Sequence, residues 1–147
     1  MFSYKLLEKP SINLNNEIID IIFKKISNKI EKKQNWTLNI VFVDSDSIKK
    51  LNNNYRKINE TTDVLSFHYF DDFDDLKKED IAWEIILNFD KILEQSKEFW
   101  LTIEQEFYKL LIHSILHILW YDHEQENDYK IMSEFEKVIW TEVFEKK

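Results

Sequence analysis

The segment 107–119 constrains the fold most strongly, because it is apolar around nearly its whole circumference. Thr102 followed by Gln105 forms a capping box, which predicts that a helix begins near residue 103 and runs through this segment. A helix without a polar face is buried on every side. We therefore expect it to lie in the middle of the fold, with the other helices and strands packed around it.

The rest of the chain supplies strands and amphipathic helices to surround that central helix. The expected helices are 15–33, a short one after the capping residues 44–46, one containing Phe89 and Phe99, and a last one with Ile131, Phe135, Val138 and Glu142 on one stripe. The expected strands are 36–43, 64–69 and 81–87, with 3–8 as a candidate fourth. Strands interleaved with helices and followed by helices alone predict one α/β or α+β domain.

Composition excludes several classes of protein. The 147 residues include no Cys, which rules out a disulfide framework, a thiolate zinc finger and a cysteine nucleophile. No apolar run approaches the roughly 18 residues of a membrane span, and the N-terminus lacks the apolar core of a signal peptide. We therefore expect a cytoplasmic protein with no membrane partner. The net charge of −8 repels nucleic acid as a whole, so any contact with RNA must depend on a local site.

Three of the four histidines lie within eleven residues. His113 and His117 are four positions apart on the central helix, about 6 Å along its axis, so both rings project from one face. His123 follows the expected helix end, where the chain can turn and present it from another direction. Three imidazoles with water in the fourth position make an open catalytic zinc site, and Asp122 is a carboxylate placed to orient a ligating ring. The spacing predicts one zinc ion per chain.

Other interpretations of these histidines remain open. A histidine on a buried helix is often a hydrogen-bonded core residue, and a purely structural ion would take a carboxylate as its fourth ligand. Zinc peptidases with an HExxH motif carry their general base beside the first histidine. Here that position is Ser114, which weighs against a peptidase.

Three blocks of this sequence resemble one known family. The run HSILHILWYDH (113–123) resembles the HGxLHLxGYDH signature of the YbeY endoribonucleases, which are bacterial ribosomal-RNA maturation factors. The segment 44–67, ending in TDVLSF, is similar to the family's YRGxxxPTDVLSFP block, and EDIAWEI (79–85) is similar to its GDIxIS strand. Together the three blocks span about residues 40–125 in the family's order.

The resemblance implies a fold and a function. The fold is a single α+β domain, here 1–147, in which a mixed four-stranded sheet and about five helices surround a central helix with a zincin-like metal site. The implied activity is zinc-dependent hydrolysis of single-stranded RNA, with zinc on His113, His117 and His123. The implied setting is maturation of the 3′ end of 16S ribosomal RNA and ribosome quality control, with the small subunit and its assembly factors as partners and no DNA.

The departures from the family pattern share one cause. Where the family has Gly or Pro, this chain has Lys57, Thr61, His68, Glu79, Ser114 and Trp120. The chain contains no Gly and one Pro, so a composition that disfavours both residues explains these changes more simply than lost function. Trp120 bears most on the site, because a Gly there permits a left-handed backbone that Trp adopts only with strain. An altered turn would change the reach of His123.

Arg56 is the one arginine among 20 basic residues, and it matches the arginine of the family's YR pair. A guanidinium offers a planar fork for two phosphate oxygens, so we expect Arg56 to clamp the scissile phosphate; a salt bridge is the competing interpretation. Tyr55, Trp83 and Trp100 are expected in the core, with stacking on RNA bases as the alternative. His68 is expected in a loop, with a place at the edge of the site as the alternative.

The sequence therefore predicts a zinc-dependent endoribonuclease, with Arg56 as its catalytic residue and Asp122 beside the metal ligands. The sequence does not identify a general base; a metal-bound hydroxide that acts alone and assistance from Asp122 both stay open. Two alternatives remain: a zincin-type metallopeptidase, and a non-catalytic assembly factor in which zinc braces the fold.

Overall fold

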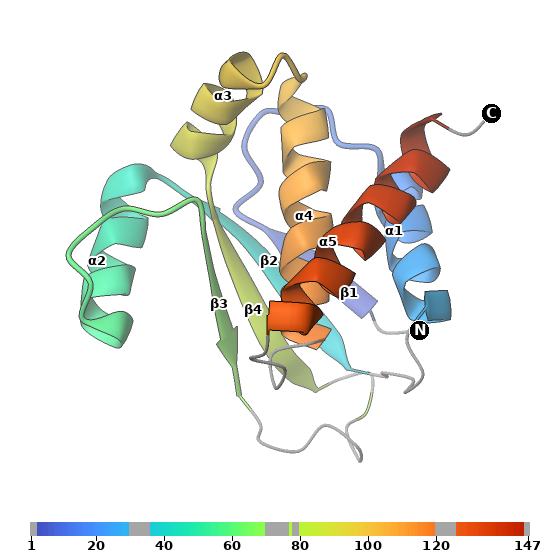
Figure 1. The fold of residues 1–147 in the computed structure, drawn as a ribbon. Coiled ribbons are helices and arrows are strands. Elements are labelled where there is room, and N and C mark those ends of the chain that lie inside the picture. The colour runs from blue at the N-terminus through green and yellow to red at the C-terminus, as the bar shows by residue number, and fades with distance from the viewer. Residues whose placement is uncertain (1–2, 30–35, 70–76, 78–79, 120–125, 146–147) are drawn as a thin grey trace.

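A computed structural model describes residues 3–29, 36–69, 77, 80–119 and 126–145. Within these ranges, four strands and five α-helices follow the order expected from the sequence (Figure 1). Along the chain they are β1 (Ser3–Leu7), α1 (Asn16–Lys29), β2 (Thr37–Val43), α2 (Ser45–Arg56), β3 (Val64–His68), β4 (Ile81–Asn88), α3 (Phe89–Glu98), α4 (Ile103–Leu119) and α5 (Glu126–Trp140), and a turn of π-helix, η1 (Thr141–Glu145), follows α5. Among the described residues no helix is long and apolar enough to cross a membrane.

The four strands form one mixed sheet in the order β1-β2-β4-β3. β1, β2 and β4 run parallel, and β3 pairs antiparallel with β4 at the edge of the sheet. A sheet of this kind beside packed helices confirms the expected α+β domain.

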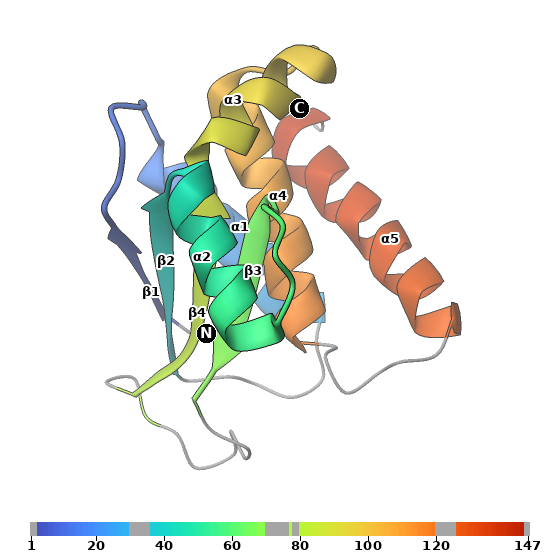
Figure 2. The same cartoon turned by 90° about the vertical axis from the view of Figure 1, so that its left-hand side faces the viewer.

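Each face of the sheet is covered by helices (Figure 2). Alternation along β2 sends Leu38, Ile40 and Phe42 into the main core, which α1, α4 and α5 complete. The opposite face carries a smaller cluster in which Ile48 of α2 packs on Leu65 and Ile86. β3 therefore separates α2 from α4 at the edge of the sheet.

α4 lies at the centre of the fold, as its apolar sequence predicts. Thr102 and Gln105 form the expected capping box: the Thr102 N–H donates to Gln105 Oε1 at 3.0 Å, and the Gln105 N–H donates to Thr102 Oγ1 at 3.0 Å. This reciprocal pair satisfies two of the backbone donors that every helix start leaves free. It fixes where α4 begins and hence the orientation of its histidines.

Three expectations about aromatic side chains were wrong. Tyr55 and Trp100 are 68% and 95% exposed, not in the core, because Tyr55 lies in the last turn of α2 and Trp100 in the turn between α3 and α4. His68 ends strand β3 and is not in a loop, and its ring lies 5.0 Å from that of Trp83, centroid to centroid. Trp83 itself is buried, as expected.

Candidate metal centre and phosphate site

One stripe of α4 reaches the surface. Between Glu106 and Ile118 every residue is buried except Lys109, His113 and His117, which recur at intervals of four. Residues four apart lie one above the other on a helix. The otherwise buried central helix therefore exposes its two histidines and one lysine along a single line, where a ligand can reach them.

The rings of His113 and His117 lie side by side on this stripe, with centroids 6.3 Å apart and planes 16° from parallel. With Zn–N bonds of about 2.0–2.1 Å, two imidazoles on one tetrahedral ion have centroids roughly 5 Å apart. Modest side-chain rotation spans the difference. The predicted projection of both rings from one face is confirmed.

Glu136 of α5 hydrogen-bonds through Oε1 to Nδ1 of His113. This hydrogen bond raises the pKa of His113 and is the largest influence on it. Burial lowers the pKa, and the negative charges of Glu136 and Asp63 raise it further. With Nδ1 bonded to the carboxylate, Nε2 of His113 is the nitrogen left for a ligand. Metal-ligating histidines usually have such a partner on their second nitrogen, and a carboxylate that favours positive charge on the ring favours a bound cation in the same way.

His117 lies in a contrasting environment. Burial is the first cause that lowers its pKa, and the positive charges of His113 and Arg56 lower it further. The neutral imidazole is therefore the prevailing form near neutral pH. That is the form that binds a metal.

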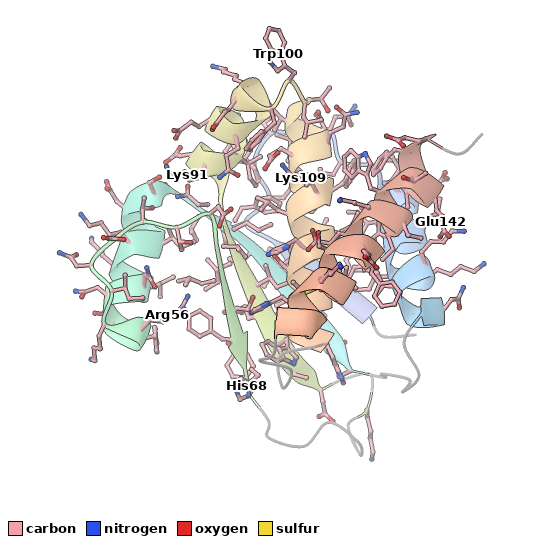
Figure 3. The ribbon with its side chains drawn as sticks, viewed as in Figure 1. Arg56, His68, Lys91, Trp100, Lys109 and Glu142 are labelled. Atoms are coloured by element: carbon pink, nitrogen blue, oxygen red, sulfur yellow. The ribbon has the colours of Figure 1, made fainter. Side chains whose placement is uncertain are left out.

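Arg56 belongs to the same electrostatic neighbourhood, because its charge acts on His117 although the two residues come from α2 and α4. It is the last residue of α2, whose start is fixed by Asp44: the Ser47 N–H donates to Asp44 Oδ1 at 2.8 Å. Lys57 then ends the helix in the left-handed conformation, with φ 60° and ψ 28°. Figure 3 shows Arg56 at this end of α2, and β3 lies between α2 and α4 in this view.

A buried asparagine holds the loop that precedes β3. Asn88 is fully buried, and its Nδ2 donates to Ser45 Oγ at 2.9 Å, Thr61 Oγ1 at 3.1 Å and the Thr62 carbonyl at 3.0 Å. These bonds tie the start of α2 to the loop that contains Asp63. The negative charge of Asp63 raises the pKa of both His113 and Glu106, so this loop helps to set the electrostatics of the site.

The donor set tests the fit of a zinc ion. His113 and His117 supply neighbouring imidazoles, one oriented by a carboxylate and one kept neutral, which suits zinc. Within the described ranges no group of three or more potential ligands converges. His123, Asp122 and Trp120 lie outside the described residues, so the third ligand, the expected carboxylate and the turn at Trp120 stay predictions.

Sequence reasoning missed two residues of this site. Glu136 is one of several acidic residues on the last helix, and nothing in its local pattern marks it as the partner of His113. Asp63 belongs to the TDVLSF block, which was a usable signal, although no role for the residue followed from it.

Comparison with known proteins gives one consistent answer. The family model of endoribonuclease YbeY matches residues 7–143. An endoribonuclease YbeY from Caldicellulosiruptor bescii is 35% identical over 143 residues, which cover 90% of each chain. Another, from Fusobacterium nucleatum, is 38% identical over 127 residues, or 84% of this chain and 78% of its own. The solution structure of a Thermotoga maritima protein matches with a TM-score of 0.55 at 22% identity, covering 95% of this chain and 90% of its own, and supports the fold alone.

Proposed function

Because this chain belongs to the endoribonuclease YbeY family, we propose that it cleaves single-stranded RNA at a zinc site formed by His113, His117 and His123. The observation that carries the proposal is the exposed pair of imidazoles on α4 together with the charge of Arg56 acting on one of them. A metal cation on these imidazoles, together with a guanidinium whose charge reaches one of them, suits a phosphodiester.

The zinc ion and the side chains of Glu136 and Arg56 have separate tasks in this proposal. Zinc supplies Lewis acidity toward the phosphate and lowers the pKa of water. Glu136 keeps the proton of His113 on Nδ1 and directs Nε2 outward. Arg56 donates two parallel hydrogen bonds to phosphate oxygens and stabilises the negative charge that develops there during cleavage.

The setting is also part of the proposal. The relatives are named endoribonucleases, and the family resemblance connects this activity with processing of ribosomal RNA in the cytoplasm. The small ribosomal subunit and its assembly factors are the expected partners. With a net charge of −8, the protein depends on a few local cations to hold RNA. The charge of Lys109 acts on His113 and that of Arg56 acts on His117, so these two cations are the candidates.

A metallopeptidase fits the site less well. Ser114 occupies the position of the peptidase base, is buried, and its hydroxyl oxygen has no hydrogen-bond partner within the described part of the chain. It faces the core and not the exposed stripe, so it has no access to a substrate. A non-catalytic, zinc-braced assembly factor is the second alternative, and it predicts zinc binding without cleavage.

The substrate class is tested by offering the purified protein two polymers, a single-stranded RNA and casein, with zinc present. We expect cleavage of the RNA and none of the casein. Casein cleavage would establish the peptidase instead, and zinc binding with neither cleavage would favour the structural role. A double-stranded RNA of the same sequence is the matched substrate control, and we expect it to resist cleavage.

A further inference from the structure

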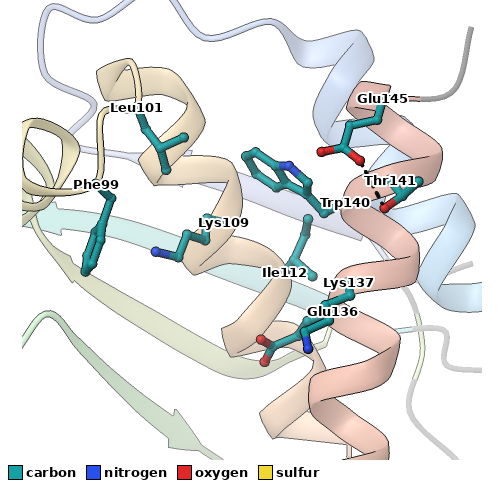
Figure 4. Close-up of a pocket in the computed structure, with 9 residues that line it drawn as sticks. All are labelled: Phe99, Leu101, Lys109, Ile112, Glu136, Lys137, Trp140, Thr141 and Glu145. Carbon is teal, nitrogen blue, oxygen red and sulfur yellow. Dashed lines mark hydrogen bonds between the residues drawn. The ribbon is translucent and has the colours of Figure 1, made fainter.

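A cavity of about 560 Å³ lies between α4, α5 and the turn that joins α3 to α4 (Figure 4). Phe99, Ile112 and Trp140 supply apolar walls. The charged lining consists of the ammonium groups of Lys109 and Lys137, from the two helices that flank the cavity, and the carboxylates of Glu136 and Glu145. Cavities of this size hold small organic ligands. The cleavage proposed above uses Glu136 and Lys109 from its lining but assigns no ligand to the cavity itself.

The cavity adjoins the histidine pair through two residues. Glu136 lines the cavity and also hydrogen-bonds to His113. Lys109 lines it from one helical turn before His113 on the exposed stripe of α4, about 6 Å away along the axis. A chain molecule with one unit at the histidines therefore has its neighbouring unit at the mouth of this cavity.

The lining suits a flat, heteroaromatic group attached to a phosphate. The ring of Phe99 is about half exposed, and Lys109 Nζ lies 4.0 Å from its centroid. Trp140 offers a second aromatic surface, partly buried against Phe144 with centroids 4.3 Å apart. Aromatic side chains stack on nucleobases whatever their sequence, and adjacent cations neutralise the backbone. An apolar peptide side chain would use the walls but leave the two ammonium groups without a partner in the ligand.

We propose that this cavity is a base-binding subsite, which holds the base of the nucleotide next to the scissile phosphate of the RNA. The proposal rests on the proposed function and adds to it a place on the protein where a substrate base is held. Lys109 then moves from the face of the Phe99 ring, where its Nζ now lies, to the phosphate between that nucleotide and the one at the histidines, and the freed ring holds the base together with Trp140.

Phe99 and Trp100 provide a matched pair of variants. Both are exposed aromatic residues at consecutive positions of the α3–α4 turn, but Phe99 lines the cavity and Trp100 points away from it (Figure 3). The experiment measures kcat/KM for short single-stranded RNAs in which one abasic nucleotide is moved along the strand past the cleavage site. Wild type, Phe99→Ala, Trp100→Ala and Lys137→Gln are compared, each with its circular dichroism spectrum as a test of folding.

In the wild type, an abasic nucleotide next to the cleaved bond should lower kcat/KM about 5- to 150-fold, the range of one base stacked on an aromatic ring. Phe99→Ala should lower kcat/KM for intact RNA by about 5-fold or more, and should lose most of the effect of the abasic nucleotide. Trp100→Ala should behave as the wild type does. Lys137→Gln, at an exposed position, should weaken cleavage of every RNA by a similar factor, which keeps the test decisive if Phe99→Ala does not fold.

Two results would overturn the subsite, and they are distinguishable. If RNA is cleaved but Phe99→Ala and Lys137→Gln match Trp100→Ala, the subsite is wrong and the proposed function stands. If the folded, zinc-loaded wild type cleaves no RNA, the proposed function is wrong and the subsite with it.

Discussion

Glu136 on α5 and His113 on α4 share a hydrogen bond across the interface of the two helices, between Oε1 and Nδ1. Substitution of Glu136 by Ala should therefore weaken zinc binding about 10- to 100-fold, the usual cost of removing the partner of a ligating histidine. The reason is that the ring of His113 loses both its orientation and the charge that favours a cation. A competition titration against a chromophoric chelator measures the affinity.

Glu134→Ala is the matched control, because Glu134 is exposed on the same helix two positions away. It should leave zinc affinity unchanged. Equal affinities for the Glu136→Ala and Glu134→Ala proteins would show that the carboxylate does not support a metal ligand.

Arg56→Lys keeps the positive charge near His117 but loses the planar fork. We expect RNA cleavage to fall by tens to hundreds of fold, about the 1.5–3 kcal/mol of a hydrogen bond to a charged group. Zinc content and melting temperature should barely change, since Arg56 is an exposed residue at the end of α2. A salt-bridge role predicts the opposite pattern, with Arg56→Lys fully active and Arg56→Ala melting at a lower temperature.

Lys57 ends α2 with a positive φ of 60°, at a position where the family pattern has Gly. Lys57→Gly should raise the free energy of unfolding by about 0.5–1 kcal/mol, because Gly adopts this conformation without a Cβ clash. Lys49→Gly, in the interior of the same helix, should lower it by about 1 kcal/mol. Urea denaturation of both variants provides the comparison, and a loss of stability in Lys57→Gly would contradict the strained cap.

Glu106 is 1% exposed, and its burial is the first cause that raises the pKa of its carboxyl group. The ammonium group of Lys109, whose Nζ lies 3.8 Å from Oε2 of Glu106, lowers that pKa. The folded state therefore holds this proton more tightly than the unfolded chain does. As pH rises from about 4.5 through the higher folded pKa, the free energy of unfolding should fall.

Glu106→Gln stays neutral, so it should remove that decline and be more stable than the wild type at neutral pH. Lys109→Gln removes the cation that lowers the pKa of Glu106, so the total decline should be larger. Thermal unfolding across this pH range measures both. A Glu106→Gln protein less stable than the wild type at neutral pH would show that the carboxylate is stabilising when ionised.

The parts of the fold that local sequence determines were predictable. The reciprocal bonds of Thr102 and Gln105, the burial of α4 and the shared face of His113 and His117 all follow from short-range spacing. Exposure was harder to predict, because Tyr55 and Trp100 carry core-type side chains at positions where the chain leaves a helix.

Long-range partners were not predictable. Glu136 reaches His113 only because α5 packs against α4, and Asp63 acts on the same ring only because Asn88 holds its loop in place. Tertiary packing brings these residues together, and one sequence contains no local signal for such pairs. Arg56 was identified because it is the one arginine in the chain and matches a family motif.

A zinc titration of the metal-free protein, with the rate of single-stranded RNA cleavage as the readout, tests the proposed zinc site and its activity together. We expect no cleavage before zinc is added, a linear rise to one equivalent per chain, and a plateau beyond it. His117→Ala should remain inactive throughout, because it lacks a ligand. Cleavage at the full rate by the metal-free protein, or by His117→Ala, would contradict the proposed zinc site.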